Sequence, residues 1–237
     1  MKTHLISYGD HFYKNQLTFL KETALDSLFF DEVRTFVPHD INSAFSTRFN
    51  TIMNSRRGGG FWIWKPYIIK KALETISSDD ILFYCDAGCT INKNGKKRFL
   101  EYKDILLNSN LGCMSFELPL KEIEYTKREI LDYFEVSDDI MNSNQLMATV
   151  VAIRKCSHAQ LLINEWYDTL CKFPLAFTDD YNPELQFTDF ISNRHDQSVF
   201  SIIRKIHGSE VIADETYYND FIRDGQNVPI WATRLKK

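Results

Sequence analysis

Short apolar runs alternate along the chain with stretches in which apolar residues recur every three to four positions. The first pattern is typical of buried strands and the second of helices that pack one face on a core. The first 90 residues predict three strands and two helices, at residues 4–8, 32–37 and 81–85 and at residues 17–28 and 65–76. Proline at position 66 fits the first turn of the second helix.

The same alternation continues to the end of the chain. Helices are predicted at residues 97–107, 122–134, 157–171 and 195–208, and strands at residues 111–118, 146–153 and 211–213. The nearly all-apolar strand 146–153 is expected to be buried on both faces. Residues 41–60 and 173–194 show no clear periodicity. Alternating strands and helices predict an α/β fold with a sheet flanked by helices.

Two of the predicted strands end in a polar turn. Tyr8-Gly9-Asp10 follows the first strand, and Asp86-Ala87-Gly88 follows the strand 81–85. Ligands of open α/β sheets bind beyond the carboxyl ends of the strands, so these turns are expected to be neighbours in space. Asp86 has two interpretations: an acid that holds a divalent metal beside phosphate oxygens, or part of an ordinary turn.

The segment RRGGGFWIWKPY (56–67) is the most unusual in the chain. Its glycines allow a close approach of backbone to a ligand, and Arg56, Arg57 and Lys65 add positive charge near a helix N-terminus. This combination suits a phosphate or diphosphate. The alternative is a flexible loop followed by Trp62 and Trp64 packed in the core, and for the tryptophans the core is the favoured interpretation.

A third candidate is the segment His195-Asp196-Gln197 at the start of a predicted helix. Asp196 could act as a general base, a metal ligand or a group that orients an acceptor. The alternative is a capping box, with Asn193 as the N-cap and Asp196 at the third helical position.

Composition narrows the class of protein. The 237 residues are 44% hydrophobic and 25% charged, with a net charge of −4, which predicts one domain and argues against a nucleic-acid-binding protein. Five cysteines without repeated spacing predict reduced thiols rather than disulfides or structural zinc. No signal peptide or membrane span of ~20 apolar residues is evident, so we expect a cytoplasmic protein. The basic tail RLKK leaves peripheral attachment to the inner face of a membrane open.

Together these stretches resemble a known family. LISYGD (5–10), RRGGGFWIWKPYIIKKAL (56–73), DDILFYCDAGCTIN (79–92) and RHDQSVFSIIRK (194–205) resemble small GT-A-fold glycosyltransferases of bacterial or viral O-antigen and capsule loci. The resemblance implies a single domain with a Rossmann-like mixed sheet. Residues 1–118 would bind the nucleotide sugar, usually a UDP-sugar, and residues 119–237 a glycan or lipid-linked glycan acceptor. The implied activity is transfer of a hexosyl or deoxyhexosyl unit in polysaccharide biosynthesis.

The resemblance also implies roles for individual residues. Such enzymes hold Mn²⁺ or Mg²⁺ with an Asp-x-Asp motif, which here corresponds to Asp86-Ala87-Gly88 and lacks the final acid. Asp86 would contact the metal or instead bond the ribose or donor sugar. Asp196 or His195 would supply a second metal ligand, and Asp196 would be the catalytic or acceptor-orienting acid. The donor nucleotide would be bound by Tyr8, Gly9, Arg56, Arg57, Lys65, Ala87 and Gly88. The acceptor would be contacted, directly or through the residues behind the reacting groups, by His195, Gln197 and Trp64.

Two other functions are compatible with parts of the pattern. A nucleotidyltransferase acting on a sugar phosphate would share the sheet and the metal, but that class carries a glycine-rich loop after its first strand, where this chain has SYGDHFYK. A non-catalytic glycan-binding module would use Trp62, Trp64 and the aromatic residues of 173–190, but such a module needs no acid at the end of a buried strand.

Overall fold

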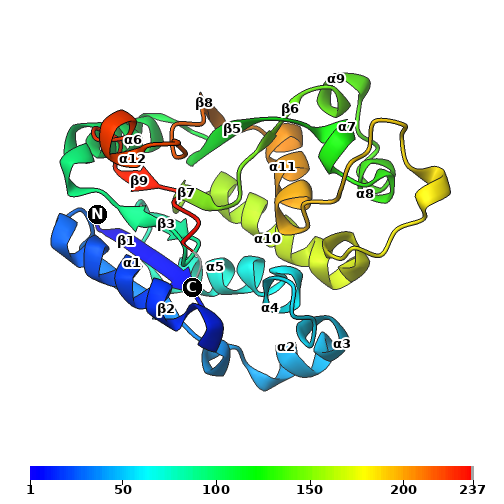
Figure 1. Ribbon diagram of the computed structural model, residues 1–237, viewed down its shortest axis with the longest axis horizontal. Helices are drawn as coiled ribbons and strands as arrows, with labels where there is room; N and C mark the ends of the chain where they lie inside the picture. The colour runs from blue at the N-terminus through cyan, green and yellow to red at the C-terminus, as the bar shows by residue number, and fades with distance from the viewer. Residues whose placement is uncertain (236–237) are drawn as a thin grey trace.

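A mixed sheet forms the centre of the computed structural model, which describes residues 1–235 (Figure 1). Its order is β2-β1-β3-β7-β5-β6, and β8 pairs with the other edge of β5. The strands are β1 (Thr3–Tyr8), β2 (Glu32–Phe36), β3 (Ile81–Cys85), β5 (Cys113–Lys121), β6 (Asn144–Leu146), β7 (Val150–Arg154) and β8 (Glu210–Ala213). A separate pair joins β4 (Thr90–Ile91) to β9 (Ile230–Trp231).

The sheet combines a parallel half with an antiparallel half. Strand β1 pairs in parallel with β2 and β3, whereas β7 runs antiparallel to both β3 and β5. The carboxyl ends of β1 and β3 therefore meet at one edge of the sheet, where the turns after Tyr8 and Cys85 are brought together.

Helices cover both faces of this sheet. The helices of the described part of the chain are α1 (Lys14–Ser27), α2 (Ser43–Arg48), α3 (Asn50–Met53), α4 (Gly58–Phe61), α5 (Trp64–Thr75), α6 (Lys96–Asn108), α7 (Glu122–Tyr125), α8 (Arg128–Tyr133), α9 (Asp138–Met141), α10 (Ser157–Lys172), α11 (Asp196–His207) and α12 (Phe221–Asp224). Leu82 and Tyr84 of β3 face a core built with α5, α10 and α11. Ile81, Phe83 and Cys85 face a second core with α1 and α6. Successive side chains of a strand point to opposite faces, so Asp86 continues the series that faces α5 and α11.

Several predicted elements have the expected positions, among them β3, α10 and the helix after His195. Residues 41–60, expected to be irregular, contain two short helices, α2 and α3, followed by a tight turn, α4, in which Gly58, Gly59, Gly60 and Phe61 all have positive φ. The side chain of Asn42 caps α2 by accepting from the amide of Phe45, and Phe45 and Phe49 anchor the segment in the core.

Two long predicted elements are interrupted. The helix expected at 122–134 is two helices, α7 and α8, because the Lys127 ammonium turns inward and donates to the carbonyls of Leu175, Thr178 and Asp180. The strand expected at 146–153 is divided into β6 and β7. Its break is held by Arg204, which donates to the carbonyls of Leu146 and Met147.

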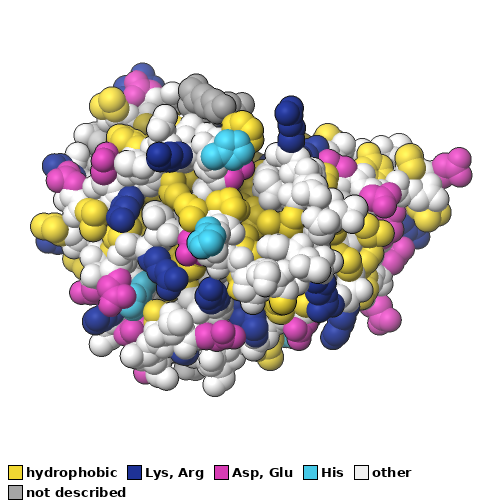
Figure 2. Space-filling view, turned by 90° about the horizontal axis from the view of Figure 1, so that it is seen from below, with side chains coloured by type: hydrophobic (Ala, Val, Ile, Leu, Met, Phe, Trp, Pro, Cys, Tyr) yellow, Lys and Arg dark blue, Asp and Glu magenta, His cyan; other side chains and the backbone are white. Residues whose placement is uncertain are grey.

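The last part of the chain returns to the carboxyl end of β3. After β9, Thr233 Oγ1 and the amide of Leu235 both donate to the carbonyl of Gly88, at 2.7 and 3.1 Å. Lys236 and Lys237, which complete the basic tail, lie outside the described residues. Within residues 1–235 no helix is long and apolar enough to cross a membrane. Figure 2 shows one face of the molecule, on which acidic and basic side chains are interspersed.

Candidate functional site

Two adjoining cavities lie where the carboxyl ends of β1 and β3 meet the N-termini of α5 and α11. The first, the aromatic cavity, has a volume of about 310 Å³ and is lined by Tyr8, Gly9, Asp10, Tyr13, Gly58, Gly59, Trp62, Trp64, Asp86, Ala87, Gly88, Cys89, Thr149, Arg194, Ala232, Arg234 and Leu235. The second, the polar cavity, is lined by Arg57, Trp62, Lys65, Asp86, Ala148, Thr149, Ser192, Asn193, Arg194, His195, Asp196 and Gln197. Trp62, Asp86, Thr149 and Arg194 belong to both, so the cavities are continuous beside Asp86.

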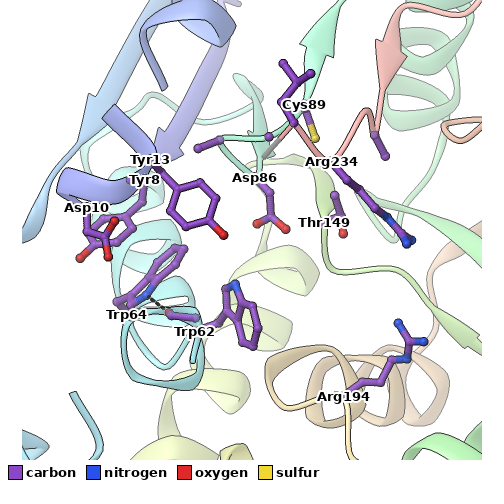
Figure 3. A pocket seen from close by; sticks show the side chains of 17 residues that line it. Tyr8, Asp10, Tyr13, Trp62, Trp64, Asp86, Cys89, Thr149, Arg194 and Arg234 are labelled. Atoms are coloured by element: carbon purple, nitrogen blue, oxygen red, sulfur yellow. Dashed lines mark hydrogen bonds between the residues drawn. The ribbon is translucent and has the colours of Figure 1, made fainter. Parts of the chain in front are cut away.

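One end of the aromatic cavity is a stack of two rings. The rings of Tyr8 and Trp64 lie 4.0 Å apart between centroids, and the Trp64 indole donates to the carbonyl of Gly58 at 3.0 Å (Figure 3). Trp64 is mostly buried, as the core interpretation expects, yet its edge also lines the cavity. Each ring covers a face of the other, so this end of the cavity is an apolar wall of ring edges beside the more exposed rings of Tyr13 and Trp62.

The glycine run before this wall has a structural cause. Gly58 and Gly60 have positive φ angles of 59° and 96°. A Cβ atom on Gly58 would come within 2.4 Å of the Trp62 ring, and one on Gly60 within 2.8 Å of the Met53 backbone. The sharp turn that brings Trp62 and Trp64 to the cavity is therefore possible only with glycine at these positions.

The polar cavity contains a buried lysine between two acids. Lys65 Nζ lies 3.1 Å from Asp86 Oδ1 and 2.6 Å from Asp196 Oδ2, and it donates to the carbonyl of Ala148 at 3.2 Å. The Tyr84 hydroxyl donates to the same Asp86 oxygen at 2.6 Å. Lys65 comes from the first turn of α5 and Asp196 from the first residue of α11, so two helices and β3 jointly fix the cluster.

Burial and charge set the protonation of this cluster. Burial and, to a lesser extent, the negative charge of Asp86 raise the pKa of Asp196 to about 6, against the lowering effect of Lys65. Burial alone would lower the pKa of Lys65, but the charges of Asp196 and Asp86 outweigh burial and raise it. Lys65 is thus a permanent cation near neutral pH, while Asp196 can exchange a proton there.

His195 is oriented away from the two acids. It has a positive φ of 56°, stacks on Phe61 and places Nε2 at 2.9 Å from Asp179 Oδ1. Arg57 contacts the other oxygen of Asp179, also at 2.9 Å. Burial lowers the pKa of His195 to about 4, so the ring is neutral at pH 7. The structure therefore places His195 against Asp179 rather than beside Asp86.

The capping-box alternative is wrong. Helix α11 begins at Asp196 with His195 as its N-cap, and no side chain caps it. The Asn193 amide donates instead to the carbonyls of Ala176 and Thr178. The Asp196 carboxylate faces the cavity and contacts Lys65, and a hydrogen bond from the backbone of Gln197 also lowers its pKa.

The other expected residues have varied positions. Gln197 lines the polar cavity; its Oε1 accepts from the amide of Ala148 at 3.3 Å and its Nε2 donates to Gln145 at 2.8 Å. Ala87 and Gly88 line the aromatic cavity. Lys65 lines only the polar cavity, whereas Arg56 is exposed and lines neither cavity of the described chain.

The sequence analysis missed two arginines. Arg194 and Arg234 line the aromatic cavity on the side away from Tyr8 and Trp64, with Asp86 between (Figure 3). Arg194 precedes the His195 segment, and Arg234 belongs to the basic tail, whose charge was linked to a membrane surface. Only the return of the C-terminal segment to Gly88 reveals that Arg234 belongs to the site.

The donor groups do not fit a divalent cation. Across residues 1–235 there is no group of three histidine, cysteine, aspartate or glutamate side chains placed to hold a metal ion. Asp86 and Asp196 both contact Lys65, and His195 pairs with Asp179. Hard cations such as Mn²⁺ and Mg²⁺ need several oxygen ligands, and these side chains do not supply them.

Known proteins are similar to this chain in structure rather than in sequence. No protein-family model matches the sequence, and no curated protein is similar to it. A glycosyltransferase involved in the glycosylation of the major capsid of PBCV-1 is 11% identical, with a TM-score of 0.56 over 98% of this chain and 93% of that one.

Two further structures have lower TM-scores. The galactosyltransferase LgtC, solved with donor and acceptor sugar analogs, is 14% identical, with a TM-score of 0.46 over 96% of this chain and 86% of its own. Mouse xyloside xylosyltransferase 1 is 11% identical, with a TM-score of 0.47 over 98% and 97%. The likeness to the PBCV-1 enzyme covers almost the whole of both chains, and the mixed seven-stranded sheet flanked by helices is the GT-A fold of glycosyltransferases.

Proposed function

We propose that this protein is a glycosyltransferase that moves a sugar from a nucleotide-sugar donor, in the first instance a UDP-sugar, to a glycan or lipid-linked glycan. The observation that carries the proposal is the pair of cavities that join at Asp86. One offers an aromatic wall and two cations, and the other a buried acid beside a lysine. A nucleotide sugar has a matching order of parts: a planar base, a ribose, a diphosphate and a sugar.

The aromatic cavity suits the nucleotide. Its aromatic end, lined by Tyr8, Tyr13, Trp62 and Trp64, provides an apolar site for the base, since stacking on aromatic side chains contributes about 1–3 kcal/mol per base. Asp86 lies between this end and the arginines, at the position that the ribose and the start of the diphosphate would reach (Figure 3). Its free carboxylate oxygen can accept a hydrogen bond from a donor hydroxyl.

The polar cavity suits the reacting sugar and the acceptor. Transfer forms a bond between an acceptor oxygen and the anomeric carbon and breaks the bond from that carbon to the diphosphate, which leaves with the electron pair. The acceptor hydroxyl loses a proton in this step. In an inverting reaction Asp196 would take that proton, and in a retaining reaction it would lie beside the anomeric carbon; the anomer of the product distinguishes these two cases.

The protonation of Asp196 supports a catalytic role. A general base works best when its pKa lies near the working pH, and the pKa of Asp196 is raised to about 6. Lys65 fixes the position of the carboxylate and keeps it mostly ionised at pH 7. Its ammonium also holds Asp86, so one side chain sets the spacing of both acids.

The acceptor and the cellular setting belong to the same proposal. The PBCV-1 enzyme acts in the glycosylation of a capsid, which supports an acceptor displayed on a cell or virion surface. We therefore infer a role in surface-polysaccharide synthesis of the O-antigen or capsule kind, at the cytoplasmic side of a membrane.

Titration calorimetry tests the donor class. The protein should bind at least one of the common nucleotide sugars (UDP-, GDP-, CMP- and dTDP-linked), and Asp86→Asn should weaken that binding about tenfold or more through loss of a charge-assisted hydrogen bond. The matched control is Asp132→Asn on the exposed face of α8. Binding of free glycans without binding of any nucleotide sugar would favour a glycan-binding module instead.

A further inference from the structure

Arg194 and Arg234 form a cationic end of the aromatic cavity. Arg194 lies two residues before the start of α11, and Arg234 lies in the C-terminal segment after β9. Each guanidinium lies over a tyrosine ring, 4.8 Å from Tyr125 for Arg194 and 4.9 Å from Tyr217 for Arg234. Within residues 1–235 neither forms an ion pair with a carboxylate, and the cation–π contact with a tyrosine is the interaction that each guanidinium makes instead.

The two cations line the same cavity, and the charge of one acts on the other. Burial lowers the pKa of Arg194, and the positive charge of Arg234 lowers it further. Two like charges held at one end of a cavity without an acid are unfavourable in the empty protein. An anion bound between them would remove this repulsion.

Gly88 links Arg234 to the missing acid of the Asp-x-Asp motif. The carbonyl of Gly88 accepts hydrogen bonds from Thr233 and Leu235, which fix the segment that carries Arg234. A Cβ atom on Gly88 would lie 3.3 Å from the Leu235 amide nitrogen and 3.4 Å from Arg234 Cα. These contacts are tight, so an aspartate at position 88 and the C-terminal segment in its present place would compete for the same space.

We propose that Arg194 and Arg234 bind the diphosphate of the nucleotide sugar and that donor binding therefore requires no divalent cation. The inference rests on the proposed function and deepens it. Two guanidinium groups carry the same total charge as one divalent cation, and their planar donors match phosphate oxygens in a bidentate way. At position 88, where an Asp-x-Asp motif has its final acid, glycine leaves room for the segment that carries Arg234.

The geometry gives these residues a defined task. The aromatic wall lies on one side of Asp86 and the arginines on the other (Figure 3). A base bound at that wall directs its diphosphate past Asp86 towards the arginines. Arg194 lines both cavities, so it can also contact the phosphate that leaves when the sugar is transferred.

Titration calorimetry in EDTA tests the inference with UDP, GDP, CDP and ADP and, for whichever binds, the matching nucleoside. The affinity of the wild-type protein for that diphosphate should differ by less than about threefold between EDTA and Mn²⁺. Arg234→Gln and Arg194→Gln should each weaken diphosphate binding about ten- to hundredfold, the range for a lost charge-assisted contact, and leave nucleoside binding unchanged. Arg234→Lys should recover part of the loss.

Controls separate binding from folding. Arg223→Gln, an exposed arginine paired with Asp224, should not change affinity. Arg234 is exposed, so its variants test the inference even if Arg194→Gln unfolds the protein. Nucleoside diphosphate binding that appears only with Mn²⁺, or arginine variants that leave it unchanged, would overturn the inference while the proposed function stands. Failure of every nucleotide to bind would overturn both.

Discussion

Replacing Lys65 with methionine removes the cation that separates Asp86 from Asp196. At an effective dielectric constant of about 20, opposite charges at the observed separations of 3.1 and 2.6 Å attract by roughly 5–6 kcal/mol per pair. Desolvation of the ammonium, which is 2% exposed, offsets several kcal/mol of this. We expect Lys65→Met to lower the free energy of unfolding by about 3–5 kcal/mol at pH 8, as for other broken buried ion pairs.

The loss of stability caused by Lys65→Met should be smaller at low pH than at high pH. Lys65 lowers the pKa of Asp196 and Asp86 raises it, so in the variant this pKa should rise above its value of about 6. An unfolded aspartate titrates near 3.9, so between these values the folded variant holds a proton that the unfolded chain lacks. Stability of the variant then falls as pH rises, by at most about 1.4 kcal/mol per pH unit. The wild type also loses stability over this range, but less, because its Asp196 pKa is lower. The destabilisation should therefore be smaller at pH 5.5 than at pH 8, by about 1 kcal/mol if the pKa rises by about one unit in the variant.

Urea unfolding followed by circular dichroism at pH 5.5 and pH 8 measures both values. Lys70→Met, in the same helix and in an exposed pair with Glu74, is the matched control and should cost less than about 1 kcal/mol at either pH. Asp196→Asn combined with Lys65→Met should recover part of the stability. An equal destabilisation at both pH values, or a loss below about 1 kcal/mol at pH 8, would show that Lys65 does not stabilise the protein by separating the two acids.

Three further predictions concern activity and binding. Because the active form of Asp196 is ionised and its pKa is about 6, kcat/KM should fall about tenfold per pH unit below pH 6, whereas residual activity of Asp196→Asn should lack this limb. Gly88→Ala should weaken nucleoside diphosphate binding several-fold in calorimetry, because its Cβ meets the Leu235 amide at 3.3 Å; unchanged affinity would contradict this. Tyr8→Leu should weaken nucleoside binding about tenfold through loss of the ring stacked on Trp64, and Tyr8→Phe should not.

The position of Asp86 could be predicted because it follows from local pattern. A wholly apolar run from Ile81 to Cys85 identifies a buried strand, and the polar turn after it marks the carboxyl end. The parallel pairing of β1 with β3 then brings Tyr8 and Asp86 to one edge. Lys65 and Asp196 could be named as candidates since each begins a helix, but the sequence did not show that they contact each other.

Other features depend on contacts between distant segments and leave no local signal. Arg234 joins the site only because the C-terminal segment bonds to Gly88, and His195 turns to Asp179 because a loop fixed by Lys127 places that acid there. The same lysine interrupts the helix expected at 122–134. Periodicity records which face of an element is buried, and it does not record which distant polar groups meet across the fold.

The most direct test of the proposed function is turnover of the donor. Purified protein is incubated in EDTA with each nucleotide sugar that binds, and release of the nucleoside diphosphate is measured with and without glycan acceptors. We expect release from one donor class, and acceptor should stimulate it. Asp196→Asn should reduce the release about a hundredfold or more while the unfolding midpoint is retained. Absence of release from every donor, in EDTA and in Mn²⁺ alike, would contradict the assignment as a glycosyltransferase.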